Sequence, residues 1–225
     1  MRVLAHRWIK EQILLDSQIH HVLVLENPKF YRDFVQSLNR QIEDDEEFMV
    51  FQEDYKSLQL SKYAFLMTNL FDIPLDEKKC ITLIYKDLEK TISENLRIAL
   101  EKLNLAINSF VQDITYDYPI PLMIKEDITL SSIMKLAEVK PFYEPSDFLT
   151  ALISRIKTLN FLMKKNIFFL VNLHDFLLED EIESLYREAD MLHVNLVSID
   201  AREPRIKSSH EKIIIIDRDL CEILK

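Results

Sequence analysis

The chain has 225 residues, which is room for one large domain or for a domain with an appendage, and it contains no glycine. The absence of glycine excludes a Walker-type phosphate loop, a G-x-G-x-x-G dinucleotide fingerprint and a G-x-S-x-G nucleophile elbow, because each needs Gly at fixed positions. The 28 basic and 38 acidic residues give a net charge of −10, which excludes a uniformly basic nucleic-acid-binding protein but not a locally basic one.

The sequence also bears on where the protein works. No apolar run approaches the ~18 residues of a membrane helix, and the first residues lack the uninterrupted apolar segment of a signal peptide. The two cysteines, Cys80 and Cys221, lie far apart and cannot form a zinc cluster on their own. We therefore expect an intracellular, cytoplasmic protein with reduced thiols, and tight turns that use Asn, Asp or Pro in place of Gly.

Both ends of the chain contain short apolar runs that are typical of buried strands. They are rich in β-branched and aromatic residues and occupy His21–Glu26, Phe48–Gln52, Tyr63–Phe71, Ile167–Leu173, Val194–Ile199 and Lys212–Asp217. Helical patterns lie between some of them: one is capped by Asn27 with Pro28 at its first position, and another covers Leu178–Leu192. Alternating strands and helices predict an α/β layer.

The middle of the chain is helical instead. Apolar residues recur every three or four positions from Leu88 to Ile114, which predicts one helix from near Asp76 to Tyr116, about 60 Å long at ~1.5 Å per residue. A shorter helix follows from about Thr129, capped by Asp127 or Thr129, and another covers Ser146–Lys165. We expect an α/β head domain (1–75 and 166–225) with an inserted, extended α-helical leg domain (76–165).

Two short elements are candidates for a catalytic or ligand site. Asp54-Tyr55-Lys56 lies beside a predicted strand and has the acid-x-Lys form found in metal-dependent nucleases, although this composition yields such matches by chance. His174-Asp175 follows a strand end, where ligands often bind in α/β sheets. We favour a helix cap by Asp175 and a surface His174 over a ligand site.

Acidic residues suggest a cation site. For the run Glu43–Glu47 we favour a solvated turn between a helix and a strand over a metal site. Asp117, Glu126 and Asp127 surround Pro119 and Pro121, where irregular backbone offers carbonyl oxygens beside carboxylates. Because Ca²⁺ takes 6–8 oxygen ligands, these three acids are candidate calcium ligands, with simple helix capping as the alternative.

The basic residues are unevenly distributed. Between Asp147 and Asp175 there is no acidic residue, and this window carries Arg155, Lys157, Lys164 and Lys165 shortly after Lys135 and Lys140. A second group lies near the C-terminus and contains Arg202, Arg205, Lys207 and Lys212. Such patches either contact a phosphate backbone or pair with the acidic surface of this chain or a neighbour. Aromatic residues do not alternate with them, so duplex fits better than single-stranded nucleic acid.

The order of these elements resembles a known family, the small CRISPR-associated adaptation protein of type II-A systems (the Csn-two family). The resemblance rests on the stretches HHVLVLEN, FMVFQEDYKSL, YAFLMTNLFDIPLD, EDITLSSIMKLAEVK (Glu126–Lys140), FLMKKNIFFLVNLHDFLLEDEIESL (Phe161–Leu185) and LVSIDAREPR. It covers nearly the whole chain and rests on order and scattered short matches.

The resemblance implies a RecA-like, P-loop-ATPase-like head without a working nucleotide site, and a ring-shaped homotetramer whose basic hole takes double-stranded DNA from its ends. It also implies calcium binding, no catalytic activity, and action beside the integrase and the guide-directed nuclease. By position, Glu126 and Asp127 fall in the acidic, calcium-associated region, with Asp117 added from proximity. Lys135, Lys140, Arg155 and Lys157 fall on leg elements that face the hole.

We therefore expect a sequence-independent DNA-binding ring protein of CRISPR spacer acquisition that is not an enzyme and binds no nucleotide. Two alternatives stay open: a metal-dependent nuclease that uses Asp54 and Lys56, and a structural adaptor whose long helix only dimerises.

Overall fold

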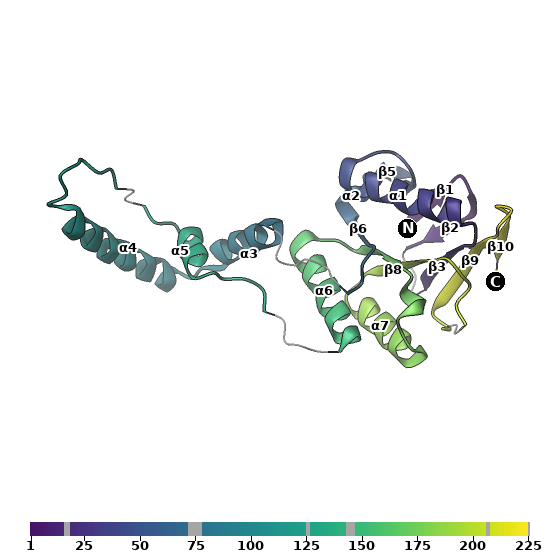
Figure 1. Cartoon of the computed structure of the whole chain (residues 1–225). Coiled ribbons are helices and arrows are strands. Elements are labelled where there is room, and N and C mark those ends of the chain that lie inside the picture. The colour runs from purple at the N-terminus through teal and green to yellow at the C-terminus, as the bar shows by residue number, and fades with distance from the viewer. Residues whose placement is uncertain (16–18, 72–77, 125–126, 143–146, 206–207, 225) are drawn as a thin grey trace. The chain divides into compact units, whose positions relative to one another are not determined.

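A computed structural model describes residues 1–15, 19–71, 78–124, 127–142, 147–205 and 208–224 (Figure 1). The chain divides into two compact units, and each is described by itself. The first contains Met1–Ile73 and Glu144–Lys225, and the second contains Pro74–Tyr143. Both ends of the chain thus build one α/β unit, and a helical segment is inserted between them.

The first unit is built on a six-stranded sheet in the order β10-β9-β3-β8-β7-β6. Five strands are parallel: β3 (His20–Leu25), β6 (Ala64–Met67), β7 (Ile167–Val171), β8 (Asn195–Asp200) and β9 (Glu211–Ile216). When these five strands are numbered by their order in the chain, their order across the sheet, starting from β9, is fifth, first, fourth, third and second. The short β10 (Glu222–Leu224) pairs antiparallel with β9 at one edge.

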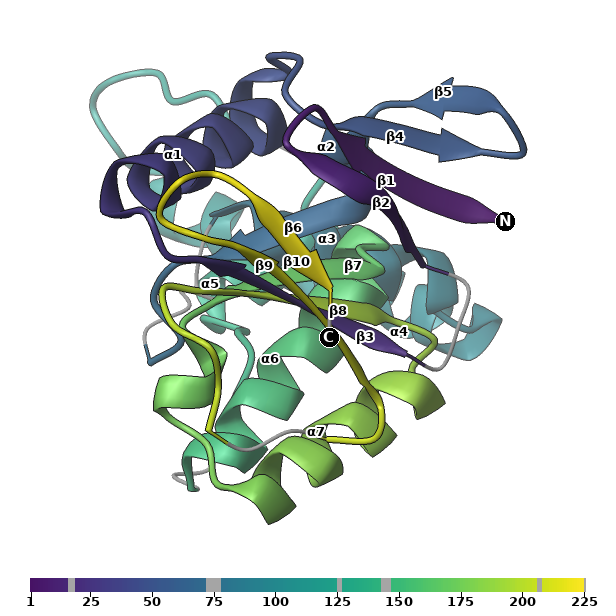
Figure 2. The ribbon, with the colours of Figure 1, turned by 90° about the vertical axis from the view of Figure 1, so that its right-hand side faces the viewer.

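Alternating side chains of this sheet face two different environments. Residues such as Leu23, Phe169 and Ile199 belong to the main hydrophobic core, together with Phe34 and Leu38 of α1 (Pro28–Asp44). The opposite face is covered by α6 (Phe148–Met163) and α7 (Glu179–Met191), as Figure 2 shows. Both faces are therefore buried, which explains the apolar runs on which the strand predictions rested.

A second, antiparallel sheet in the order β2-β1-β4-β5 packs onto the α1 side. It contains β1 (Arg2–His6), β2 (Ile9–Leu14), β4 (Val50–Glu53) and β5 (Lys56–Leu58), and the four-residue α2 (Leu60–Tyr63) follows it. Leu4, Ile13 and Phe51 of this sheet are fully or almost fully buried in the main core. The sequence predicted β4 but neither its separate sheet nor its partners.

The described residues of the second unit form three helices: α3 (Lys78–Thr91), α4 (Glu94–Thr115) and α5 (Leu130–Leu136). The prediction of one uninterrupted helix from 76 to 116 was wrong, because the helix breaks at Ile92-Ser93 and Ser93 caps α4 by accepting from the Leu96 amide. The Tyr85 hydroxyl of α3 donates to the carbonyls of Met134 and Val139, at 3.2 and 3.0 Å, and so ties α3 to the α5 region.

The unit boundary also differs from the expected one. The leg was expected to include Ser146–Lys165, but the compact units assign Glu144 onward to the first unit. The physical reason is that α6 buries Leu152, Ile156 and Leu159. An amphipathic stripe in the sequence shows that a helix packs on something, but it does not show on which unit.

Turns without glycine are formed by other residues that accept positive φ. Asp45, Asp54 and Asn172 are of the predicted kind, while Tyr55, Lys164, His193 and Leu220 were not expected there. Left-handed backbone costs an L-residue other than Asn or Asp about 1–2 kcal/mol.

No helix of the described ranges is long and apolar enough to cross a membrane.

Candidate functional site

A cluster of polar side chains lies on the otherwise apolar sheet face beneath α7. Ser198 and Asp200 come from the end of β8, Glu211 from the start of β9, His174 from the short 3-10 helix Leu173–Asp175 after β7, and Tyr186 from α7. Ser198 and Asp200 are two apart and so point to the same face. Buried polar groups are exceptional in such a core, which makes this cluster the first candidate for function.

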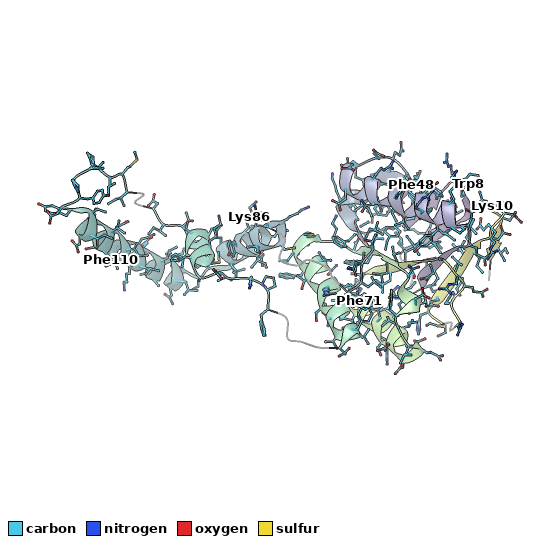
Figure 3. The ribbon with its side chains drawn as sticks, in the orientation of Figure 1. Trp8, Lys10, Phe48, Phe71, Lys86 and Phe110 are labelled. Atoms are coloured by element: carbon cyan, nitrogen blue, oxygen red, sulfur yellow. The ribbon has the colours of Figure 1, made fainter. Side chains whose placement is uncertain are left out.

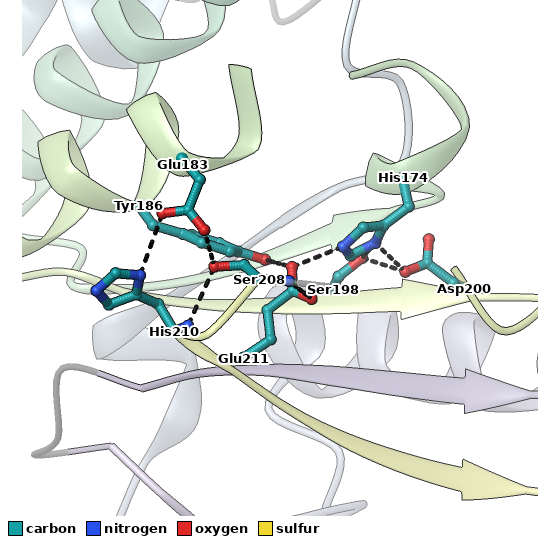
Figure 4. Close-up of polar contacts among 8 residues, drawn as sticks. All are labelled: His174, Glu183, Tyr186, Ser198, Asp200, Ser208, His210 and Glu211. Carbon is teal, nitrogen blue, oxygen red and sulfur yellow. Dashed lines mark hydrogen bonds and ion pairs between the residues drawn. The ribbon is translucent and has the colours of Figure 1, made fainter. Parts of the chain in front are cut away.

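The imidazole of His174 is held between two carboxylates (Figure 4). Its Nδ1 atom lies 2.7 Å from Oδ2 of Asp200, and its Nε2 atom lies 2.8 Å from Oε1 of Glu211. The three side chains are 6, 5 and 1% exposed. Ser198 donates to the same Asp200 oxygen at 2.6 Å, and Tyr186 donates to Oε1 of Glu211 at 2.6 Å.

These contacts fix the charge of the imidazole. Burial alone lowers the pKa of His174, but hydrogen bonds and attraction from Asp200 and Glu211 outweigh burial and raise it to about 9. The pKa of Glu211 is lowered, because hydrogen bonds from His174 and Tyr186 outweigh its burial. At neutral pH the cluster is therefore an imidazolium shared by two carboxylates.

His20 on the same face has the opposite protonation state. Its ring stacks on Tyr186 at 4.3 Å, and its Nδ1 atom accepts a hydrogen bond from the Leu196 amide at 3.2 Å. Burial lowers the pKa of His20 to about 4, although Asp190 acts in the other direction. Two histidines in different protonation states therefore lie beneath α7. His20 is neutral and accepts a hydrogen bond from the backbone, whereas His174 is charged and donates to two carboxylates.

The polar cluster continues toward the surface. The carboxylate of Glu183 in α7 accepts from the Ser208 hydroxyl and from Nδ1 of His210, the latter at 3.2 Å. The amide of Ser208 donates to Oε2 of Glu211 at 3.2 Å, which links the two parts (Figure 4). Ser208, His210 and Glu211 lie on one segment, so α7 and β9 are held together by polar contacts.

This arrangement does not serve nucleophilic catalysis. A serine–histidine pair needs a ring nitrogen free to take the hydroxyl proton. Here both nitrogens of His174 donate to carboxylates, the raised pKa keeps the ring charged, and Ser198 is 1% exposed. The side chains of Asp200, His174 and Glu211 instead form a fixed row of alternating charges, here called the ionic strip. One acceptor of this strip, Oδ1 of Asp200, has no hydrogen-bond partner in the described structure.

A cavity of about 330 Å³ opens beside this strip, at the carboxyl ends of β7 and β8. Its lining combines buried apolar residues with charged groups from three neighbouring segments: His174, Asp175, Leu177, Ile182, Asp200, Ala201, Arg202, Glu203, Pro204 and Arg205. Arg202 lies 4.0 Å from Asp175, and these side chains are 83 and 56% exposed.

Two expectations about this region were wrong. His174 is not a surface residue, since its side chain is 6% exposed and lies between two acids. Asp175 does not cap α7: Leu178 is the N-cap residue, and its amide donates to the Glu181 carboxylate at 2.8 Å. The sequence did contain one indication of this cluster: Ser198 and Asp200 are polar residues on one face of an otherwise apolar strand. It does not indicate which side chains they contact.

Two of the predicted DNA-binding residues, Arg155 and Lys165, donate hydrogen bonds to backbone carbonyls. The guanidinium of Arg155 in α6 donates to the carbonyls of Leu70 and Phe71 at 2.9 and 2.8 Å. The ammonium of Lys165 donates to the Ser61 carbonyl. Both residues therefore connect α6 and the residues after it to the α2–β6 region of the same unit, and their role in binding DNA stays a prediction.

The other four predicted lysines are exposed. Lys157 pairs with Glu188 of α7 at 2.8 Å, with its side chain 48% exposed, and the Lys164 ammonium lies 5.1 Å from the centre of the Phe161 ring. In the second unit, Lys135 lies in the last turn of α5 and Lys140 follows that helix. Among the described side chains, no ion pair involves Lys135 or Lys140.

The predicted calcium ligands are only partly described. Asp117 after α4 and Asp127 before α5 are both exposed, whereas Glu126 lies outside the described residues. The cap of α5 is Thr129, whose hydroxyl accepts from the Ser132 amide, so Asp127 is not used for capping. Within the described ranges, no three His, Cys, Asp or Glu side chains gather in a way that would hold a metal ion.

The acid-x-Lys element lies in a hairpin turn. Asp54 and Tyr55 have φ of 49° and 63° and connect the paired residues Glu53 and Lys56 of β4 and β5, as in a type I′ turn. The Asp54 carboxylate is 76% exposed and lies 2.7 Å from the terminal amine of Met1. This geometry gives Asp54 a structural role and offers the nuclease interpretation no metal site.

Comparison with known proteins adds the family. The family model described as "CRISPR-associated protein (Cas_Csn2)" matches residues 41–220. A curated relative, "CRISPR-associated protein Csn2" from Streptococcus agalactiae, is 24% identical over 183 residues, which cover 80% of this chain and 81% of the relative. The family model spans the C-terminal end of α1, the strands from β4 to β9 and the helices between them, so the chain belongs to the Cas_Csn2 family of CRISPR-associated proteins.

Proposed function

We propose that this protein acts in CRISPR spacer acquisition as a ring-shaped homotetramer that binds double-stranded DNA at its ends without reading sequence. The observation that carries the proposal is the match to the Cas_Csn2 family over residues 41–220, because membership of this family implies a role in CRISPR adaptation. The partners proposed with it are the integrase complex and the guide-directed nuclease of the same system.

The first unit supports a RecA-like head that has lost its nucleotide site. Its five parallel strands lie in the order fifth, first, fourth, third, second. In phosphate-loop proteins a long glycine-rich loop joins the first strand of such a sheet to the next helix. Here β3 ends at Leu25 and α1 begins at Pro28, so only two residues occupy that place.

The exposed apolar face of α4 supports self-association. No residue of α4 is buried, and Leu96, Leu103 and Phe110, spaced by seven, are 58, 43 and 64% exposed. The Phe110 side chain is drawn in Figure 3. Residues seven apart share one helix face, and contiguous apolar surface of this kind marks an interface. A second copy of the chain is the occupant that a ring requires.

The exposed lysines support contact with a phosphate backbone. In an acidic protein of net charge −10, DNA binding needs a local positive surface. Lys135, Lys140 and Lys164 have exposed side chains, and Lys157 is exposed but pairs with Glu188. A ring repeats each of them once per subunit, so weak single contacts add. Arg155 and Lys165 are less available, because they already bind backbone carbonyls.

Calcium binding stays a proposal, and a calcium site would need more ligands than the described acids supply. Two exposed carboxylates, Asp117 and Asp127, cannot supply the 6–8 oxygens that Ca²⁺ takes. The missing ligands would come from Glu126, from backbone carbonyls or from a second copy of the chain. We therefore propose that calcium stabilises the assembly, and we derive no step of DNA binding from it.

Binding of linear and closed circular duplex, each with Ca²⁺ or Mg²⁺, tests the proposal. We expect the linear duplex to bind, the circle to bind weakly, and both to remain intact. The double variant Lys135→Glu/Lys140→Glu should weaken binding to all duplex sequences alike. It should also flatten the plot of log affinity against log salt, by about 0.9 for each lost phosphate contact.

The variant Lys29→Glu/Lys56→Glu serves as the matched control, because it makes the same charge change at two exposed lysines of the first unit outside α5 and α6. Equal losses in both variants would mean that net charge alone sets the affinity. Cleavage of the duplex would favour a nuclease, and neither binding nor cleavage would favour a structural adaptor. Each of these outcomes contradicts the proposal.

A further inference from the structure

The cavity at the carboxyl ends of β7 and β8 has the features of a built ligand site, and it lies wholly within the first unit. In open α/β sheets, ligands bind in the crevice beyond the carboxyl ends of the parallel strands. Its volume of about 330 Å³ exceeds the roughly 30 Å³ share of a single water and falls within the range of small-molecule pockets.

One oxygen of the lining has no partner. Oδ1 of Asp200 makes no hydrogen bond in the described structure, although its side chain is only 5% exposed and the residue lines the cavity. The second oxygen, Oδ2, accepts from both His174 and Ser198 (Figure 4). A buried carboxylate oxygen left without a donor costs free energy, so a donor from a ligand would stabilise the folded protein.

The charge around this oxygen favours a cationic donor over a neutral one. The imidazolium of His174 is one positive charge between the carboxylates of Asp200 and Glu211, so the ionic strip keeps a net negative charge in the interior. Buried charge is stable when it is paired. Arg202 and Arg205, which also line the cavity, are exposed, and neither donates a hydrogen bond to Oδ1.

A bare metal ion fits this cavity less well than an amine. No three potential metal-ligating side chains come together within the described ranges. Arg202 and Arg205, which line the cavity together with Asp175 and Glu203, can attract an anionic group, and only a ligand that carries both charges can use them as well as Asp200.

We propose that this cavity binds a small molecule that carries a primary ammonium group and an anionic group, such as an aminoalkyl phosphate or an amino acid. The ammonium donates to Oδ1 of Asp200, and the anion lies between the guanidinium groups of Arg202 and Arg205. The residues that line this cavity differ from the four lysines proposed to contact DNA.

Titration with phosphoethanolamine, followed by calorimetry and by the amide NMR signals of the cavity residues, tests the proposal. Ethylamine carries only the ammonium and 2-hydroxyethyl phosphate carries only the anion. We expect phosphoethanolamine to bind at least tenfold more tightly than either compound, and to shift the signals of Asp200 and Arg202.

Two variants of the cavity complete the design. Asp200→Asn should lower the affinity by about 10- to 100-fold, which is the range expected for a lost hydrogen bond to a charged group. Because Asp200 also holds His174, Ala201→Phe is the second variant: Ala201 is exposed at the mouth, so filling it should block binding without disturbing the ionic strip. Asp33→Asn on the exposed face of α1 is the matched control and should bind normally.

Several results would overturn the proposal. Equal binding of 2-hydroxyethyl phosphate would show that no cation is required, and equal shifts with sodium or calcium ions would show an inorganic site. Binding that survives both Asp200→Asn and Ala201→Phe would lie elsewhere on the protein. No binding of phosphoethanolamine at millimolar concentration by a folded wild-type protein would remove the proposed ligand class.

Discussion

The Nδ1 atom of His174 lies 2.7 Å from Oδ2 of Asp200, in the interior beneath α7. Nothing in the sequence indicates this pair, since 26 positions separate the two residues. The contact turns a histidine into a charged structural element, and this has a consequence for stability at high pH.

We predict that stability falls as the pH rises from 6.5 toward 9. The pKa of His174 is about 9 in the folded chain against 6.5 for an ordinary histidine, so between these values the native state binds more protons than the unfolded state. The shift corresponds to about 3 kcal/mol, which is fully present below pH 6.5 and is lost through pH 9. Urea unfolding at pH 6, 7.5 and 9 measures it.

The His174→Gln variant should lose about 3 kcal/mol at pH 6 and show a much weaker fall toward pH 9. His193→Asn is the control, because His193 is exposed and Asn tolerates its positive φ of 53°. A His174→Gln variant that keeps the wild-type slope would mean that another group causes the pH dependence.

Arg155 is predicted to be a structural residue. Its guanidinium donates to two carbonyls, those of Leu70 and Phe71, at 2.9 and 2.8 Å. Arg155→Gln should therefore lower the free energy of unfolding by about 1.5–3 kcal/mol, as expected for hydrogen bonds from a charged donor. Lys157→Gln is the matched control on α6: it breaks a partly exposed ion pair with Glu188 and should cost no more than about 1 kcal/mol.

Measuring duplex binding of the same two variants separates the roles. If Arg155→Gln keeps its stability but loses DNA affinity, the two carbonyl contacts are dispensable and Arg155 contacts DNA. If it loses stability alone, Arg155 should be removed from the set of proposed DNA-binding residues.

The sequence predicted local elements well and tertiary partners poorly, for a physical reason. The six strand predictions match strands, and Asn27 caps α1 as expected by accepting from the amides of Lys29 and Phe30. Caps and apolar alternation act within a few residues, so they are visible in the sequence. The break at Ser93 was missed because the apolar spacing continues across it.

The candidate site could not be predicted from the sequence alone, because its residues meet only in the folded chain. His174, Tyr186, Asp200 and Glu211 come from four elements, and only the strand order and the packing of α7 bring them together. The antiparallel sheet was missed for a similar reason: β1 pairs with β4, nearly fifty residues later, and nothing local in either strand names the other. Long-range pairing is decided by packing, not by periodicity.

We predict that ATP neither binds tightly nor is hydrolysed. The first backbone amides of α1, which would otherwise bind phosphate, already donate to Oδ1 of Asn27 at 3.1 Å, and the Nδ2 group of Asn27 donates to the Arg218 carbonyl at 3.0 Å. Calorimetry with Mg²⁺-ATP should show no heat of binding. A magnesium-dependent ATPase that copurifies with the protein, and that a point change in the first unit abolishes, would contradict this prediction.

Calcium is predicted to raise the melting temperature of the protein, because it relieves repulsion between acids that are adjacent in the sequence, Glu126 and Asp127, and binds only the folded form. The double variant Glu126→Ala/Asp127→Ala should remove most of that rise, and Asp117→Ala should remove part of it. A chelator titration followed by melting gives the measurement. An undiminished rise in the double variant would move the site elsewhere, with the exposed run Glu43–Glu47 tested next.

The last prediction concerns assembly through the apolar face of α4. Leu103 and Phe110 are seven apart, so they lie on one face, and both are largely exposed in the single chain. Burial against a second copy would stabilise an assembly by up to about 1.5–3 kcal/mol per side chain. We expect the wild-type chain, of 26.8 kDa, to elute with light scattering as a tetramer in calcium, and Leu103→Gln/Phe110→Gln to yield smaller species.

Leu105→Gln is the matched control for this variant. Leu105 is 72% exposed on the same helix, but it is two residues from Leu103 and so faces roughly the opposite side. The control removes one leucine, whereas the double variant removes a leucine and a phenylalanine. Both should keep α4 helical, which circular dichroism checks. Dissociation by Leu105→Gln alone would place the interface on the other face of α4, and a wild-type monomer at micromolar concentration in calcium would exclude the ring.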